Sequence, residues 1–269
     1  PPGITPPPGP VPPLDPKRWA RLPEPEDGLS EAAQRYFGVT SLLPVAGSQA
    51  AIQALPVLRA PGRVGVLSPA YAEHAYGWAR AGHEVIPLAP DRIDSLLAEL
   101  QTLVLVNPNN PTGHRFERDQ LLEWHARLAD RGGWLVVDEA FMDSTPEASL
   151  AAEGALPGLI VLRSLGKFFG LAGARVGFVL AAPDLLARLD DLLGPWTIGS
   201  AAREVARKAL SDARWQTDTR RKLRSAGERL ALILKANGLT PSGGTTLFQW
   251  VLTDEAEALR DALAGRGIL

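Results

Sequence analysis

The sequence contains no cysteine in its 269 residues, so disulfide bonds and thiol chemistry are excluded. Its four histidines are scattered and show no spacing typical of metal ligands. It has no apolar run long enough to span a bilayer and no secretory signal pattern, which favours a cytoplasmic protein. The formal net charge is only −2, so the overall charge does not favour a nucleic acid or an anionic membrane as a partner.

The overall composition is typical of a globular protein, but the N-terminal segment is unusual. Hydrophobic residues make up 45% of the chain and charged residues 22%, which is typical of a protein with a sizeable core. Proline dominates residues 1–16, PPGITPPPGPVPPLDP. Because proline lacks an amide donor and fixes φ, this segment is expected to form an extended arm.

Apolar runs recur through the middle of the chain, and helical patterns separate most of them. Strands are predicted at 63–69, 83–88, 102–107, 134–140, 158–164 and 175–181. Helices are predicted at 71–82, 91–100 and 118–133. Strands without polar alternation that are joined by helices indicate a parallel sheet covered on both faces.

One connection breaks this alternation. Only about ten residues separate the strands at 158–164 and 175–181, whereas a parallel crossover needs about a dozen or more. The second of these strands is therefore expected to run antiparallel. Its first residue, Arg175, would then lie at the same edge of the sheet as Lys167.

The pattern changes after residue 182, where helices predominate. A helix is predicted over DLLARLDDLLG, a long charged helical stretch over 199–236, a strand over 245–253 and a last helix over EAEALRDALAG. GRGIL looks like the start of a further strand, so the last domain is expected to be incomplete. We therefore expect three parts: an extended arm at 1–29 that belongs to the small domain, a large domain at 30–194, and a small α+β domain at 195–269.

Residues with useful chemistry follow the predicted strands at one edge of the sheet. Open α/β sheets bind ligands at the carboxyl ends of their strands, and one glycine-serine pair also opens a helix ahead of the first predicted strand. The candidate residues are Gly47, Ser48, Gln49, Tyr71, Asn110, Asp138, Ser164, Lys167 and Arg175.

Together these residues match the chemistry of pyridoxal 5'-phosphate. Its aldehyde needs a lysine amine, which Lys167 offers, and its ring nitrogen needs a carboxylate, which Asp138 offers. Tyr71 can stack on the ring, and Asn110 can donate to the phenolic oxygen.

The phosphate of this cofactor needs backbone N–H groups, a hydroxyl and a cation. The helix start at Gly47, Ser48 and Gln49 would supply the first, Ser164 the second and Arg175 the third. Each residue also has an ordinary structural explanation: Ser48 can be a helix cap, and NPNNPTG is typical of a turn. The shared order and placement of all of them favours the cofactor site.

Three segments carry a resemblance to a known family. NNPTG (109–113), DEAF (138–141) and SLGKFFGLAGARVGF (164–178) resemble the most specific blocks of the class I/II aminotransferase superfamily of fold-type I pyridoxal-phosphate enzymes. The resemblance covers residues 18 to 269. It implies a mostly parallel seven-stranded sheet with one antiparallel strand, a smaller α+β domain, a homodimer, and the residue roles given above.

Within this superfamily, the segments LPVAGSQAAIQALP and VLRSLGKFFGLAGAR most resemble the branch of cobalamin-biosynthetic threonine-phosphate decarboxylases. This resemblance implies decarboxylation of L-threonine O-3-phosphate to (R)-1-amino-2-propanol O-phosphate, with Lys167 as the catalytic residue. Spacing alone does not separate this reaction from that of a histidinol-phosphate-type aminotransferase. A non-catalytic homologue that binds the cofactor is the second alternative.

The sequence departs from the family pattern at three places. Phe141 stands where the family usually has a tyrosine, and Leu22 stands where aminotransferases have the tyrosine of an RYP motif. The family's arginine for the substrate carboxylate is expected beyond Leu269. From the sequence alone, the chain is therefore expected to bind the cofactor but to decarboxylate poorly, since a carboxylate without a bidentate partner loses affinity and orientation.

Overall fold

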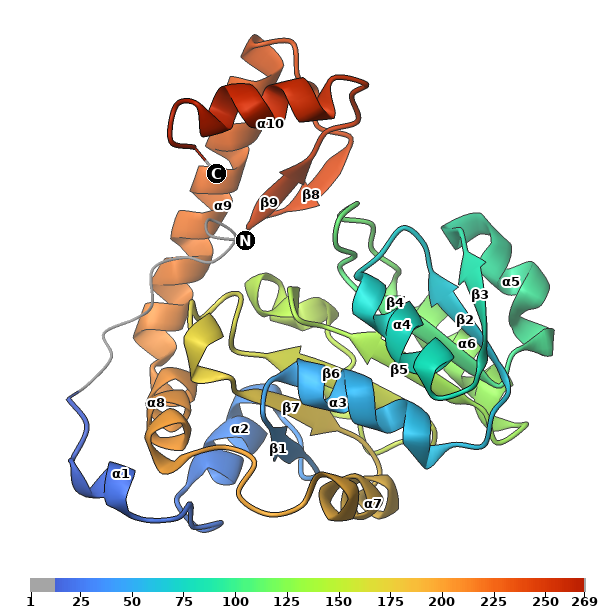
Figure 1. Cartoon of the computed structure of the whole chain (residues 1–269), viewed down its shortest axis with the longest axis vertical. Coiled ribbons are helices and arrows are strands. Elements are labelled where there is room, and N and C mark those ends of the chain that lie inside the picture. The colour runs from blue at the N-terminus through green and yellow to red at the C-terminus, as the bar shows by residue number, and fades with distance from the viewer. Residues whose placement is uncertain (1–12, 269) are drawn as a thin grey trace.

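The computed structural model describes residues 13–268, so most of the proline-rich segment and Leu269 lie outside the described residues (Figure 1). The strands are β1 (Leu43–Val45), β2 (Arg63–Leu67), β3 (Glu84–Leu88), β4 (Thr102–Val106), β5 (Trp134–Asp138), β6 (Leu159–Ser164), β7 (Gly177–Leu180), β8 (Gly243–Thr245) and β9 (Phe248–Trp250). The helices are α1 (Lys17–Ala20), α2 (Leu29–Phe37), α3 (Ser48–Ala54), α4 (Ala72–Arg80), α5 (Ile93–Leu96), α6 (Arg118–Ala129), α7 (Pro183–Leu193), α8 (Ser200–Ser211), α9 (Ala213–Ala236) and α10 (Ala256–Ala264).

Seven strands form the main sheet, in the order β1-β7-β6-β5-β4-β2-β3. Strands β2 to β6 pair in parallel, and β7 runs antiparallel to both of its neighbours. The predicted antiparallel strand and the mostly parallel seven-stranded sheet are thus confirmed. The residue patterns missed β1, because it has only three residues and contains Pro44, which an edge strand tolerates.

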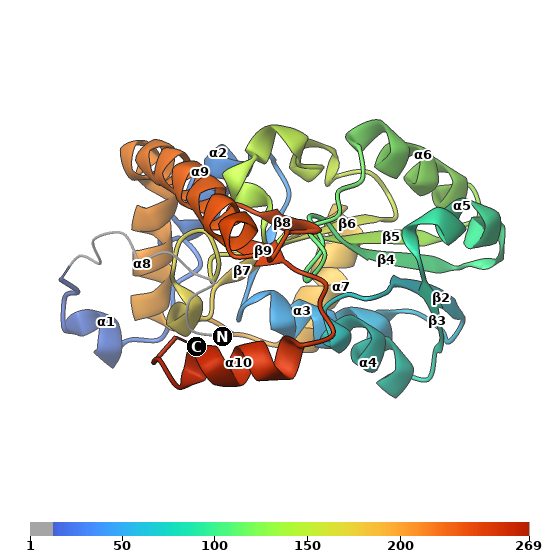
Figure 2. The same cartoon turned by 90° about the horizontal axis from the view of Figure 1, so that it is seen from above.

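Helices cover both faces of this sheet (Figure 2). Successive residues of β4 show why: Leu103 and Leu105 join a core packed against α2, α6 and α8, whereas Val104 joins a second core packed against α3, α4 and α7. In Figure 2, α5 and α6 lie on one side of the strands, and α3 and α4 lie on the other. The strands are apolar on both faces because both faces are buried.

Two of the predicted helices are interrupted. The segment predicted as a helix at 91–100 contains a single α-helical turn, α5, between 3-10 turns at Pro90–Arg92 and Leu97–Glu99. The helical stretch at 199–236 is two helices that separate at Asp212, whose carboxylate accepts a hydrogen bond from the Trp215 N–H at 2.9 Å. Periodicity continues across this break, and a capping aspartate alone is a weak signal within a charged segment.

Helix α9 extends away from the main sheet, and strand β9 of a two-stranded hairpin packs against it (Figure 1). Helix α10 follows this hairpin and lies apart from α9 in the view of Figure 2. The single strand predicted at 245–253 is instead part of a hairpin, in which Thr245 ends β8 and Phe248–Trp250 forms β9, antiparallel to it. Helix α8 packs against α2 and buries Ala206 and Leu210 in the large core. The domain division at residue 195 stays a prediction.

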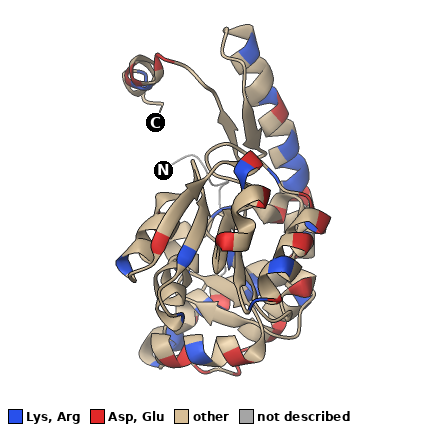
Figure 3. Cartoon of the chain, turned by 90° about the vertical axis from the view of Figure 1, so that its right-hand side faces the viewer, with Lys and Arg blue, Asp and Glu red and all other residues tan. Residues whose placement is uncertain are grey.

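Charged side chains are distributed over the molecule with both signs mixed. In the view of Figure 3, acidic and basic positions are interspersed on the helices around the sheet, and α9 carries several basic positions. Within residues 13–268, no helix combines the length and the apolar character needed to cross a bilayer.

Candidate active site

A cavity of about 400 Å³ lies at the carboxyl ends of the parallel strands. Eight of the nine candidate residues line it: Ser48, Gln49, Tyr71, Asn110, Asp138, Ser164, Lys167 and Arg175. The remaining lining residues are Val106, Ala140, Phe141, Gly166 and Ala172. Segments separated by more than 100 residues in the sequence thus meet in one place.

The ninth candidate, Gly47, lies beneath one end of this cavity. It has a φ of 73°, and a Cβ atom at this position would lie 2.7 Å from Nη2 of Arg175. A Cβ at Gly177 would similarly lie 2.5 Å from the backbone nitrogen of Ser48. These two glycines therefore let the start of α3 lie against β7 with a guanidinium directly above it.

Arg175 itself adopts the left-handed conformation, with φ 53° and ψ 51°. This conformation is uncommon for a residue other than glycine. Its side chain is exposed, and one guanidinium N–H donates to the Ala172 carbonyl at 3.1 Å. The free part of the guanidinium and the N–H groups at the start of α3 form a group of donors suited to an anion.

Asp138 lies at the other end of the cavity and is 96% buried. Its Oδ1 accepts a hydrogen bond from the Ala140 N–H at 3.0 Å, and its Oδ2 lies 3.0 Å from Nε2 of His74. Because a carboxylate accepts hydrogen bonds, the proton of a neutral His74 is on Nε2. Both carboxylate oxygens are therefore held in place.

Sequence reasoning missed His74. Its position three residues after Tyr71 in the first turn of α4 was the available signal, since residues three apart on a helix face the same side. A lone histidine is a weak signal, however, and its partner Asp138 is distant in the chain. Only the folded structure joins them.

Lys167 projects into the cavity and is half-buried. Burial lowers the pKa of its amine; the Asp138 carboxylate opposes this shift, and Arg175 adds to it. The Nζ atom lies 5.4 Å from the centroid of the Phe141 ring. A lowered pKa increases the neutral fraction of the amine, which is the nucleophilic form.

The segment NPNNPTG places Asn110 by using its other asparagines as structural residues. The Asn107 Oδ1 accepts from the Phe116 N–H at 3.0 Å, and the Asn109 Nδ2 donates to the Pro69 carbonyl at 2.9 Å. Both are 99% buried. Asn110 lines the cavity, so the turn and the functional interpretation of this motif are compatible.

Tyr71 forms a side wall and is 42% exposed. Its hydroxyl donates to Oε1 of Gln49 at 3.2 Å. Burial raises the pKa of Tyr71, and the carboxylates of Glu73 and Asp138 add to this shift. The residue therefore stays a neutral ring with a fixed hydroxyl near neutral pH.

This set of donors and acceptors fits pyridoxal phosphate. The loop at Gly47 would be filled by any side chain larger than hydrogen, and it presents N–H groups and a guanidinium at one end. A buried carboxylate and an amine with a lowered pKa lie at the other end. A flat, phosphorylated aldehyde with a basic ring nitrogen matches both ends.

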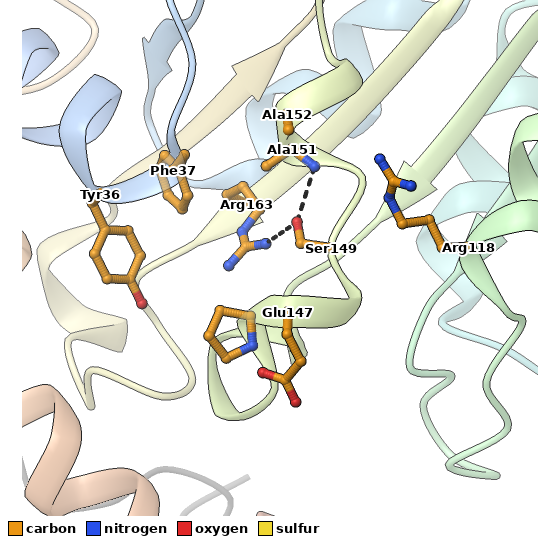
Figure 4. Close-up of a pocket in the computed structure, with 9 residues that line it drawn as sticks. Tyr36, Phe37, Arg118, Glu147, Ser149, Ala151, Ala152 and Arg163 are labelled. Carbon is orange, nitrogen blue, oxygen red and sulfur yellow. Dashed lines mark hydrogen bonds between the residues drawn. The ribbon is translucent and has the colours of Figure 1, made fainter.

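A second polar cluster lies next to the first and faces away from the cavity. The Arg163 guanidinium is 2.7 Å from a Glu139 carboxylate oxygen and 2.5 Å from one of Asp143, with all three side chains at most 1% exposed. Although burial disfavours its charge, the Asp143 and Glu139 carboxylates raise the pKa of Arg163. Figure 4 shows this guanidinium between Tyr36 and Ser149 at a separate cavity of about 390 Å³.

The chain belongs to the class I and II aminotransferase family, whose family model matches residues 15–269. It is 54% identical over 267 residues to a threonine-phosphate decarboxylase of Pseudomonas aeruginosa, which covers 99% of this chain and 81% of that protein. A threonine-phosphate decarboxylase of a Sinorhizobium species is 40% identical, with the same two coverages.

Aminotransferases are more distant. A histidinol-phosphate aminotransferase of Mycobacterium bovis is 34% identical, over 93% of this chain and 70% of that protein. The crystal structure of a histidinol-phosphate aminotransferase from Sinorhizobium meliloti in complex with pyridoxal-5'-phosphate has a TM-score of 0.83 at 24% identity, covering 94% of this chain and 74% of that one. This likeness shows the same fold.

Proposed function

We propose that this chain is a pyridoxal-phosphate-dependent decarboxylase that converts L-threonine O-3-phosphate into (R)-1-amino-2-propanol O-phosphate for cobalamin synthesis. The identity with the threonine-phosphate decarboxylase of Pseudomonas aeruginosa, which extends over nearly the whole chain, carries this proposal. The alternative of an aminotransferase has the weaker support of relatives at 34% identity.

The cofactor would be held by the residues that line the cavity. We assign its aldehyde to Lys167, its ring nitrogen to Asp138 and its ring face to Tyr71. The phosphate would lie on the loop Gly47-Ser48-Gln49 with Ser164 and Arg175, and the phenolic oxygen would accept a hydrogen bond from Asn110. When bound, the cofactor supplies an acceptor for the electron pair that remains on the substrate Cα as CO2 leaves.

The residues of the chain would control charge and protons around this chemistry. Asp138, held by His74 and the Ala140 N–H, places a fixed negative charge at the ring-nitrogen end. Lys167 would deliver the proton that replaces the carboxylate on Cα from its Nζ, because this amine projects into the cavity. Phe141 lies next to this amine and would limit the access of water.

We also propose that the protein acts as a homodimer in the cytoplasm. Exposed apolar residues support a contact surface, notably Trp19 and Trp196, which are 74% and 59% exposed. Light scattering of the purified protein tests the dimer, and a monomer at all concentrations would contradict it.

The decisive experiment supplies O-phospho-L-threonine alone to the protein loaded with cofactor. The proposal predicts release of CO2 in equal amount to the phosphorylated amine, without any keto acid, and the rate of release tests the poor turnover expected from the sequence alone. Amino transfer from histidinol phosphate that requires a keto acid would support the aminotransferase instead. Binding of cofactor without any turnover would support the non-catalytic homologue, and Lys167→Ala should remove both turnover and the visible absorbance of the lysine-bound cofactor.

A further inference from the structure

Glu73 links the two helices that begin at the cavity. One carboxylate oxygen, Oε2, accepts hydrogen bonds from Nε2 of Gln49 at 2.7 Å and from Nε2 of Gln53 at 3.0 Å. The two glutamines lie one turn apart on α3 and therefore face α4 together. Glu73 lies in the first turn of α4, two residues after Tyr71, the N-cap of this helix.

These hydrogen bonds determine how the Gln49 amide is oriented. Its Nε2 is occupied by Glu73, so its Oε1 is left to accept from the Tyr71 hydroxyl at 3.2 Å. The reverse orientation would place the amide oxygen against a carboxylate, where it has nothing to accept. Gln49 therefore contributes its backbone N–H to the anion-binding loop, while its side chain connects Glu73 to Tyr71.

The two helices are also in close backbone contact at this point. A Cβ atom at Gly77, one helical turn after Glu73, would lie 3.0 Å from the Ile52 carbonyl oxygen of α3. The spacing between α3 and α4 is therefore small and defined. Glu73 acts at the end of this contact that is nearest to the cavity.

We propose that Glu73 is a positioning residue that sets the geometry between the phosphate loop and the stacking ring. Three residues carry the assignment: Glu73 orients Gln49, and Gln49 holds the hydroxyl of Tyr71. Glu73 itself does not line the cavity. This inference rests on the proposed function, because it assumes that pyridoxal phosphate occupies the cavity.

The proposal predicts the direction in which removal of the Glu73 carboxylate changes the affinity for pyridoxal phosphate. If Glu73 acted only as a negative charge near a phosphate dianion, its removal would strengthen cofactor binding. A positioning role predicts the opposite for Glu73→Ala, because Gln49 and Tyr71 lose their fixed orientation. Glu73→Gln should keep the function, since its amide oxygen still accepts a hydrogen bond from Gln49.

The test is an equilibrium titration of cofactor-free protein with pyridoxal phosphate, followed by absorbance. Glu73→Ala is expected to raise Kd by about tenfold, the effect of losing a hydrogen bond to a charged group, and Glu73→Gln to stay within about twofold of the parent. The matched control is Glu123→Ala, which removes a carboxylate from α6 on the opposite face of the sheet. Melting temperatures establish that all variants are folded.

A double-mutant cycle distinguishes an effect of Glu73 that acts through Tyr71 from a general disturbance of the structure. Tyr71→Phe keeps the ring and removes the hydroxyl, so Glu73→Ala should cost less in that background than in the parent. Equal costs in both backgrounds, or tighter binding in Glu73→Ala and Glu73→Gln alike, would overturn the proposal. Failure of the parent protein to bind pyridoxal phosphate would instead overturn the proposed function.

Discussion

Asp138 and Glu139 are neighbours in the chain, yet they belong to two different polar regions. Asp138 faces the cavity, whereas Glu139 faces the opposite side and pairs with Arg163. The next strand repeats the arrangement, since Ser164 lines the cavity and Arg163 lies behind it. Successive side chains point to opposite sides at the ends of two adjacent strands. Each of these two pairs of neighbouring residues therefore supplies one side chain to the cavity and one to the buried cluster.

The two regions differ in how completely their charges are paired. Arg163 has two buried carboxylate partners and a hydrogen bond to the half-buried Ser149. In the cavity, Lys167 is half-buried and Arg175 is exposed, with one carbonyl contact. The difference indicates that the first region stabilises the strand ends, while the second leaves charge for a ligand. Substitutions in the two regions should therefore separate stability from function.

Arg163→Met should cause the largest effect, a loss of about 3–5 kcal/mol in the free energy of unfolding. The substitution leaves Glu139 and Asp143 buried without their partner. Urea unfolding measures the loss. The control is the triple variant Arg163→Met, Glu139→Gln, Asp143→Asn, which removes all three charges and should recover most of the stability; a single variant as stable as the parent would contradict the comparison.

Asp138→Asn should act on function instead. It removes the fixed charge at the ring-nitrogen end, and turnover should fall by about 10- to 100-fold, as for the loss of a charge-assisted hydrogen bond of about 1.5–3 kcal/mol. The free energy of unfolding should change less than in Arg163→Met, because the new amide still offers an oxygen to the Ala140 N–H and the His74 ring can change tautomer. Asp143→Asn is the matched control, made five residues further along in the other region, and it should show the reverse pattern of a larger stability loss.

Gly177→Ala should affect both regions at once. Its Cβ would lie 2.5 Å from the Ser48 nitrogen and 2.8 Å from the Arg163 carbonyl, so the phosphate loop must move away from β7. We expect a destabilisation of about 1–3 kcal/mol and weaker binding of pyridoxal phosphate. Gly173→Ala, where a Cβ meets no atom within 4 Å, is the control. Unchanged binding in Gly177→Ala would show that the loop tolerates the shift.

The smallest predicted effect is on the pH dependence of stability. Because the pKa of Lys167 is lowered in the folded protein, the unfolded chain binds more protons between that value and the ordinary lysine pKa of about 10.4. The free energy of unfolding of cofactor-free protein should therefore rise with pH in this window. Urea unfolding should show a smaller rise in Lys167→Met, with Lys235→Met as the control; an identical rise in both would place its origin elsewhere.

Much of the architecture could be predicted because each long strand has a strong local signal. The parallel strands appear as apolar runs, and the short link before Arg175 required an antiparallel strand. The break at Asp212 and the short strand β1 could not be predicted, since neither changes the local pattern of apolar residues. His74 and Glu73 escaped notice because their partners are distant in the sequence.

The sequence by itself determined the identity and order of the groups at the cavity, because strand ends in a parallel sheet share one edge. Only the tertiary structure decided which charges are free and which are paired. Asp138 and Glu139 look alike in the sequence, and so do Arg163 and Arg175. The members of each pair differ in their burial and in the side chains around them. These differences depend on contacts between distant segments, which the local sequence does not contain.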